Sequence, residues 1–234
     1  MIDLLLLAMF CNEHIVLLGP PGTAKTTVAN RLAQLISDGE FFYNLMTRFT
    51  TPDEVFGPVS LPSLKIGELK RNTSAYLPTA SIALLDEIFK SSSIILNSIL
   101  DILNERTFKN NGKVRATPLL TLIGASNEMP AGDLSALFDR FTFRFWTQRL
   151  DRSDLRRYMR LINTEGNFKY EPFCKFSWDA IVWLKEKSRE LVIPEYVLDF
   201  LNDLIGAMDC DVSERRVRKA IEVLKVNAVM EKKQ

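Results

Sequence analysis

The stretch GPPGTAKT, from Gly19 to Thr26, determines how the rest of the chain is interpreted. It has the form of a phosphate-binding loop, G-x-x-x-x-G-K-[ST], except that Ala24 stands in place of the second glycine. The apolar run His14–Leu18 before it predicts a buried strand, and Thr26–Ile36 has the apolar spacing of a helix. Strand, loop and helix in this order favour a phosphate site over an ordinary Gly-Pro turn.

The positions of this loop have separate expected roles. Its backbone amides and the start of the following helix offer partial positive charge to phosphate oxygens. Lys25 is expected to reach the β and γ phosphates, and Thr26 to place its hydroxyl on Mg²⁺. Ala24 is expected at negative φ, because a side chain at positive φ costs about 1 kcal/mol. The expected nucleotide-binding residues of the loop are Gly19, Pro20, Pro21, Gly22, Thr23, Ala24, Lys25, Thr26 and Thr27.

Two later apolar runs end in polar residues that suit the same ligand. Ser81–Leu85 predicts a buried strand that ends at Asp86 and Glu87. Leu119–Gly124 predicts another strand, closely followed by Asn127. Ligands of open α/β sheets bind at the carboxyl ends of the strands. Asp86 is therefore expected to hold Mg²⁺ through water, Glu87 to polarise the attacking water and Asn127 to position it. The alternatives are a capped strand end and a turn-forming asparagine.

Arginines further along the chain are candidates to stabilise the phosphate charge. Arg140 is expected to act from a neighbouring subunit, where a guanidinium raises turnover about 10³–10⁵-fold. Arg144 competes for this role, and the alternative is a surface arginine paired with Asp139 or another acid. In the last expected helix, Arg215 could reach the nucleotide, with Arg216 as the runner-up. A solvated basic face or a weak nucleic-acid patch would explain the same residues.

The remaining pattern predicts an α/β domain over residues 1–150 and a helical domain over residues 151–234. Leu4–Cys11 is expected to form a buried helix, because it lacks the flanks of a signal peptide and the length of a membrane span. Further strands are expected over Glu40–Leu45 and, at an edge or half-buried, over Phe141–Trp146. Thr51 is expected to start a short helix with a capping box. An inserted hairpin or loop is expected at residues 58–78, and helices at 92–104, 151–163, 177–191, 195–208 and 213–231.

The composition is that of a globular protein without a strong charge bias. Of 234 residues, 47% are hydrophobic and 25% charged, and the formal net charge is +1, so nucleic acid is not an expected partner. Cys11, Cys174 and Cys210 lack metal or disulfide spacing and are expected to be reduced and buried, which suits a cytoplasmic protein. Because His14 is the single histidine, a His-based metal site or catalytic triad is nearly excluded.

Taken together, these features resemble the MoxR branch of the AAA+ ATPases, and more narrowly its RavA-type members. The stretches that carry the resemblance span nearly the whole chain: VLLGPPGTAKT, FFYNLMTRFTTPDEVFGP, YLPTASIALLDEIFK, ILNERTF, LIGASNEMP, LFDRF and VSERRVRKAI. The resemblance implies a P-loop AAA+ parallel-sheet core with helices on both faces, followed by a small all-α lid. It also implies ATP hydrolysis with Mg²⁺ in a homo-oligomeric ring, usually a hexamer. Chaperone-like remodelling of a protein client, often beside a von Willebrand factor A-domain partner, is the implied task.

The same resemblance assigns roles to the candidate residues. Gly19–Thr26 would be the Walker A motif, Asp86 and Glu87 the Walker B pair, Asn127 sensor 1, Arg140 the arginine finger and Arg215 sensor 2. Family members continue before Ile2 and after Gln234, so this sequence is expected to be a fragment, a mis-assigned start or part of a split gene. The alternatives are a nucleotide-binding module without hydrolysis, a magnesium-chelatase-like subunit and a DNA-directed motor, which the near-neutral charge disfavours.

Overall fold

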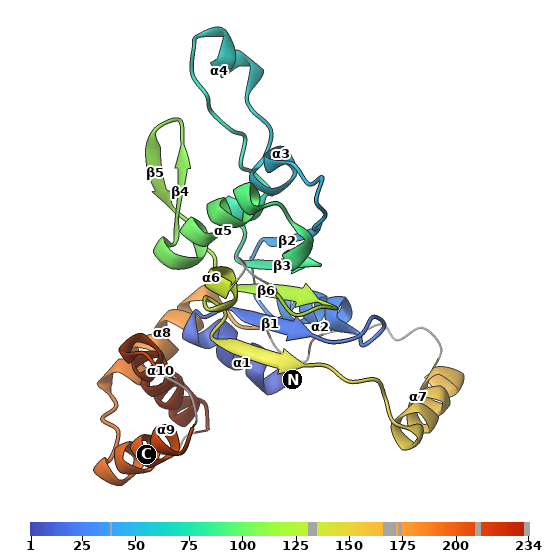
Figure 1. Cartoon of the computed structure of the whole chain (residues 1–234), viewed down its shortest axis with the longest axis vertical. Helices are drawn as coiled ribbons and strands as arrows, with labels where there is room; N and C mark the ends of the chain where they lie inside the picture. The colour runs from blue at the N-terminus through green and yellow to red at the C-terminus, as the bar shows by residue number, and fades with distance from the viewer. Residues whose placement is uncertain (38, 131–134, 166–171, 173–174, 209–211, 232–234) are drawn as a thin grey trace.

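Five parallel strands form the centre of the molecule, in the order β2-β3-β6-β1-β7 (Figure 1). Their bounds are β1 Ile15–Leu18, β2 Phe41–Leu45, β3 Ile82–Asp86, β6 Thr121–Ser126 and β7 Phe143–Trp146. The structure is a computed structural model that describes residues 1–37, 39–130, 135–165, 172, 175–208 and 212–231. Because all five strands run in one direction, their first residues share one edge of the sheet, the amino edge, and their last residues share the carboxyl edge.

Helices cover both faces of this sheet, which confirms the predicted α/β architecture. One face carries α3 (Pro52–Phe56) and α5 (Ser93–Glu105), and the other carries α1 (Ile2–Cys11) and α2 (Lys25–Ala33). In β1, Val16 and Leu18 belong to the first core, and Ile15 and Leu17 belong to the second. A strand between two helical layers needs apolar side chains on both faces, which explains the continuous apolar run.

Several local predictions are confirmed by this arrangement. The run Leu4–Cys11 lies within α1, and its residues Leu5, Ala8, Met9 and Phe10 are buried. Thr51 caps α3 with a reciprocal capping box to Glu54, as expected. The alternating strand β7 lies at the edge of the sheet. Cys11 is partly buried, and burial raises the pKa of its thiol to about 12; the other two cysteines lie outside the described residues.

An arm and a hairpin project beside β2 and β3, on the side of the sheet away from β7 (Figure 1). The arm, residues 58–72, contains α4 (Leu61–Lys65) and occupies part of the predicted insertion. The hairpin, β4 (Thr107–Asn110) with β5 (Lys113–Ala116), was not predicted. Its turn is Asn111-Gly112 at φ 52° and 70°, the dipeptide that favours two-residue hairpins, so the sequence did contain a signal.

Helices dominate the described residues that follow the sheet. They are α7 (Arg152–Glu165), α8 (Trp178–Glu190), α9 (Glu195–Ala207) and α10 (Glu214–Met230). Within the sheet region, the short helix α6 (Ser135–Phe138) precedes β7, and two short 3₁₀ helices, Leu77–Thr79 and Ile88–Lys90, flank β3. Ile181 of α8 and Val226 of α10 are buried in the core around α1, whereas α7 lies apart from them (Figure 1). The domain boundary at residue 150 stays a prediction. In the described part of the chain, no helix has the length and apolar character needed to cross a membrane.

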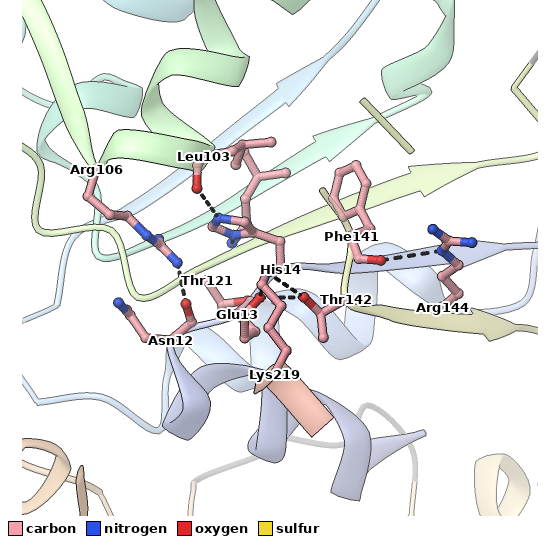
Figure 2. A network of polar contacts seen from close by, with 11 residues as sticks. Asn12, Glu13, His14, Leu103, Arg106, Thr121, Phe141, Thr142, Arg144 and Lys219 are labelled. Atoms are coloured by element: carbon pink, nitrogen blue, oxygen red, sulfur yellow. Dashed lines mark hydrogen bonds and ion pairs between the residues drawn. The ribbon is translucent and has the colours of Figure 1, made fainter. Parts of the chain in front are cut away.

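A polar network at the amino edge joins α10 to the sheet (Figure 2). The carboxylate of Glu13, just before β1, accepts hydrogen bonds from Lys219 of α10 at 2.5 Å and from Thr142 before β7. Lys219 also donates to the Thr142 hydroxyl at 2.9 Å. The ion pair is largely shielded from solvent, so it fixes where α10 sits against the sheet.

His14 stabilises the same edge from inside the core. Its Nδ1 accepts from the Leu122 backbone N–H at 3.1 Å, so its Nε2 carries the proton and donates to the Leu103 carbonyl at 3.3 Å (Figure 2). Burial lowers the pKa of His14 well below its usual value, and the nearby Arg106 lowers it further. The only histidine of the sequence is therefore a neutral structural residue that links β1, β6 and α5.

Candidate phosphate-binding site

The loop between β1 and α2 needs glycine at two positions. Gly19 has a φ of 134°, and a Cβ there would lie 2.3 Å from the Thr147 carbonyl oxygen. Gly22 has a φ of 79°, with no described atom within 4 Å of an added Cβ, so the backbone angle alone favours glycine. Pro21 and Thr27 are exposed on the loop and on the first turn of α2. The loop therefore turns tightly at Gly22.

The expected conformation of Ala24 is wrong. Ala24 is the N-cap of α2 and has a φ of 61° and a ψ of 21°, in the left-handed region. The chain takes this conformation where it turns into the helix, and alternating left- and right-handed residues direct successive backbone N–H groups toward one point. The methyl group is exposed, so the cost is backbone strain of about 1 kcal/mol rather than a clash with packed neighbours.

The Lys25 side chain lies folded across the loop and is buried. Its ammonium donates to the Gly19 carbonyl at 2.8 Å, the Pro20 carbonyl at 3.0 Å and Oδ1 of Asn127 at 3.0 Å. Burial lowers the pKa of Lys25, and attraction by the nearby carboxylates of Asp86 and Glu87 opposes this shift. The loop thus holds a positive charge at its centre, with neutral oxygens as hydrogen-bond partners that a phosphate could replace.

Thr26 and Asp86 meet across the loop, as the sequence predicts for a metal pair. The Thr26 hydroxyl donates to Oδ2 of Asp86 at 3.1 Å. The other oxygen, Oδ1, accepts from the Glu87 backbone N–H at 3.0 Å, which orients the carboxylate. Hydroxyl and carboxylate oxygens are the hard ligands that Mg²⁺ prefers beside phosphate oxygens and water. These two residues therefore fit a magnesium ion that is shared with a bound nucleotide.

Glu87 and Asn127 form the remaining part of the site at the carboxyl edge. Asn127 follows β6 and uses both ends of its amide, because Oδ1 accepts from Lys25 and Nδ2 donates to Oε1 of Glu87. Oε2 of Glu87 lies 3.3 Å from the Lys90 ammonium in an ion pair without hydrogen-bond geometry. Glu87 has a φ of 53°, an unusual angle for a residue of this kind. Lys90 was not singled out from the sequence.

Thr147 is a second contributor that was not expected from the sequence. It follows β7, and its hydroxyl donates to the Leu18 carbonyl at 2.9 Å and lies 2.8 Å from the Thr23 hydroxyl. Thr23 also donates to the Pro20 carbonyl at 3.0 Å. Thr147 therefore anchors the phosphate loop from the neighbouring strand. Its place directly after a strand, like that of Asn127, is the signal that could have identified it.

Arg140 lies away from the phosphate loop, near the amino edge. It lies three residues before the first residue of β7 and lines a cavity of about 900 Å³ with Arg144, Arg215 and Arg216. Among the described residues, its buried Nε has no hydrogen-bond partner. Asp139, the expected alternative partner, instead pairs with Arg144 at 3.2 Å and Arg216 at 2.6 Å. The competitor Arg144 is further held over the Phe138 ring, 3.9 Å from its centre.

The structure does not bring Arg215 to the phosphate loop of its own chain. Arg215 lies in the first turn of α10, one turn before the Lys219 contact to Glu13 at the amino edge. The phosphate loop follows β1 at the opposite edge of the sheet, where Asp86 and Asn127 also lie. The candidate residues therefore form two groups, one at each edge of the sheet.

Comparison with known proteins identifies related chains. Residues 1–169 match the family described as the MoxR domain in the MoxR-vWA-beta-propeller ternary systems. Two proteins of Methanocaldococcus jannaschii, MJ0079 and MJ0812, are 38% and 36% identical over 98% and 100% of this chain. The chain spans 60% and 62% of their lengths. Structural protein ORF618 of Acidianus two-tailed virus is 31% identical over 59% of this chain and 24% of its own.

A solved structure supports the fold. A protein from Cytophaga hutchinsonii, named as a candidate ATPase, superposes with a TM-score of 0.76. The match covers 99% of this chain and 74% of the other. At 20% identity, this similarity shows the shared α/β fold with its helical region and nothing finer.

Proposed function

The chain belongs to the MoxR family of AAA+ ATPases, and on this basis we propose that it hydrolyses ATP at the carboxyl edge of its sheet. The observation that carries the proposal is the continuous contact from Lys25 through Asn127 to Glu87, beside the Thr26–Asp86 pair. It joins a phosphate-binding cation to a carboxylate through one amide. A strand end that was only capped would not need the amide to contact both groups.

Each of these side chains has a task that its position supports. Lys25 would exchange its carbonyl partners for the β and γ phosphates, as P-loop lysines do. Thr26 and Asp86 would hold Mg²⁺, which neutralises phosphate charge when bound. Glu87 would accept a proton from the attacking water, and Asn127 would hold that water in line with the γ phosphate. Thr147 would keep the loop in place by its contacts to Leu18 and Thr23.

A ring would complete this site with a cation from the next subunit. Arg140 lies at the opposite edge from its own phosphate loop, and none of the ion pairs among the described residues involves it. A head-to-tail arrangement of subunits could bring one subunit's amino edge to the next subunit's carboxyl edge. In that arrangement Arg215, on the same cavity as Arg140, would also serve the neighbour's nucleotide. We propose a closed homo-oligomer, with a hexamer as the expected size.

The partners follow from the family rather than from the geometry. The matching family is described with a von Willebrand factor A-domain protein and a β-propeller protein, and we propose partners of both kinds for this chain. Remodelling of a protein client, membership of the RavA-type subgroup and a cytoplasmic location stay predictions. A co-purification that recovers neither partner type from cells that carry both would contradict the partner proposal.

The Glu87→Gln variant tests the catalytic assignment. It keeps the shape of the side chain but removes the base, so ATP should bind with unchanged affinity while turnover falls about 10²–10⁴-fold. Calorimetric ATP binding and phosphate release would be measured on the same sample. Glu105→Gln, an exposed acid at the end of α5, is the matched control and should hydrolyse normally. Normal turnover by Glu87→Gln would show that the base is another group.

The second candidate function is nucleotide binding without hydrolysis. The observation that favours it is the ion pair between Lys90 and Glu87. Because this pair engages the carboxylate of the proposed base, it would hinder Glu87 from accepting a proton. Lys90→Gln separates the two functions: it should speed hydrolysis or leave it unchanged in an ATPase. A chain that binds ATP but releases no phosphate, with or without Lys90, would be a binding module.

A further inference from the structure

A second cavity, of about 480 Å³, lies at the amino edge between α8, α10 and the start of β1. It shares Arg215 and Lys219 with the cavity beside Arg140 and otherwise has its own lining. Six cationic side chains and two carboxylates line it: Arg106, Lys185, Arg189, Arg215, Lys219 and Lys225, with Glu13 and Glu222. The net positive charge of this cavity contrasts with the formal charge of +1 for the whole chain.

Both carboxylates are already engaged by lysine or arginine. Glu13 pairs with Lys219, and Glu222 lies 3.3 Å from Arg218, which does not line this cavity. In the described part of the chain, none of the ion pairs includes any of the other five cations. The cavity therefore concentrates positive charge that the protein itself does not neutralise.

Arg106, Lys185 and Arg189 lie near enough to repel one another, although Arg189, like Arg215, is exposed to solvent. Arg106 donates to the carbonyls of Leu119, at 2.7 Å, and Asn12, and burial lowers its pKa to about 10. Burial also lowers the pKa of Lys185, and repulsion by Arg106 and Arg189 adds to the shift. Like charges in a partly buried site destabilise the chain unless an anion neutralises them.

We propose that this cavity binds a compact polyphosphate group. Lysines supply point charges and arginines supply paired N–H donors, the two side chains that phosphate oxygens favour. A cavity of this volume is suited to a small ligand rather than to an extended nucleic-acid strand, which would need a longer basic groove. The phosphates could be free in solution or belong to a nucleotide held by a neighbouring copy. The free-ligand case does not depend on the proposed hydrolysis.

Inorganic pyrophosphate is the probe for the free-ligand case. Its binding would be measured calorimetrically on Lys25→Ala protein, in which the phosphate loop lacks its cation. We expect binding that weakens as salt is raised, and a further loss of about tenfold or more when Lys185→Gln and Lys225→Gln are added. Lys65→Gln with Lys70→Gln, exposed in the arm, is the charge-matched control and should leave binding within about twofold.

ATP turnover provides the second arm, with the phosphate loop intact. If the phosphates belong to a neighbour's nucleotide, the Lys185→Gln and Lys225→Gln pair should raise the KM for ATP while pyrophosphate binding to Lys25→Ala protein is absent. The thermal midpoint of the Lys185→Gln and Lys225→Gln double variant should equal or exceed that of the unsubstituted protein, because two cations are removed from a cavity with a net positive charge. A lower midpoint would indicate that the two lysines have a purely structural role. The proposal would be overturned if the two substitutions changed neither pyrophosphate binding nor the KM for ATP. It would also be overturned if the arm control changed these quantities equally.

Discussion

The polar side chains at the two edges of the sheet differ in whether a ligand could replace their present contacts. At the carboxyl edge, Lys25 and Asn127 make contacts that a ligand can exchange, with neutral oxygens and with one another. At the amino edge, Glu13 and His14 are bound to Lys219, Thr142 and backbone groups of β6 and α5 (Figure 2). The first set is arranged around a point where phosphate could sit, and the second set fixes the packing of α10.

In the proposed ring, one sheet would carry out hydrolysis at its carboxyl edge and contact the next subunit at its amino edge. Positive φ does not distinguish the two edges, since Ala24 and Glu87 adopt it at the carboxyl edge and Asn12 adopts it just before β1. What distinguishes the amino edge is that Arg140 and Arg215 lie there, beside the ion pair that holds α10 in place. Substitutions at the two edges should therefore have different effects. At the carboxyl edge they should alter hydrolysis in the same chain, whereas at the amino edge they should alter hydrolysis in the neighbouring subunit or the stability of the fold.

The largest expected effect at the amino edge comes from Arg140→Ala. Turnover should fall about 10³-fold or more, because the guanidinium stabilises phosphate charge in the next subunit. Mixing Arg140→Ala with Glu87→Gln protein should restore part of the activity, since one interface then has both groups. No recovery on mixing, with each variant still assembling, would mean that Arg140 acts within its own chain or not at all.

The next effect is on stability and depends on pH through His14. His14 is neutral in the folded chain, whereas its unfolded pKa is near 6.5, so the unfolded chain takes up the additional proton as pH falls. The free energy of unfolding should therefore drop by about 2 kcal/mol between pH 7 and pH 5. Chemical denaturation at both pH values would measure it. The His14→Gln variant should lose most of this slope, and an unchanged slope would assign it to other groups.

The smallest effect sharpens the description of the phosphate loop. Ala24→Gly should stabilise the chain by about 0.5 kcal/mol, because relief of backbone strain exceeds the extra freedom of glycine in the unfolded state. Ala33→Gly, in the right-handed last turn of α2, is the matched control and should destabilise by about 1 kcal/mol. Denaturant midpoints would be compared. Destabilisation by Ala24→Gly equal to that of the control would contradict the left-handed angle.

The sequence predicts which polar residues meet at the carboxyl edge, because the signals for them are local. Asp86 and Asn127 come at the ends of apolar runs, and parallel strands place such ends together. The angle at Ala24 was not predicted, because it depends on how the loop closes against Thr147 on another strand. The place of Arg215 was not predicted either. It depends on the contact between Glu13 and Lys219, which are 206 residues apart and carry no local pattern.

The most direct test of a shared site is ATP turnover per subunit, measured with Mg²⁺ across a wide range of protein concentrations. Lys25→Ala protein serves as the blank, because it lacks the phosphate-binding cation. A shared site should give turnover per subunit that climbs with protein concentration as neighbouring edges meet, and none above background in the blank. Turnover that is constant from dilute to concentrated protein, yet abolished by Lys25→Ala, would show a self-sufficient site and contradict the role of Arg140.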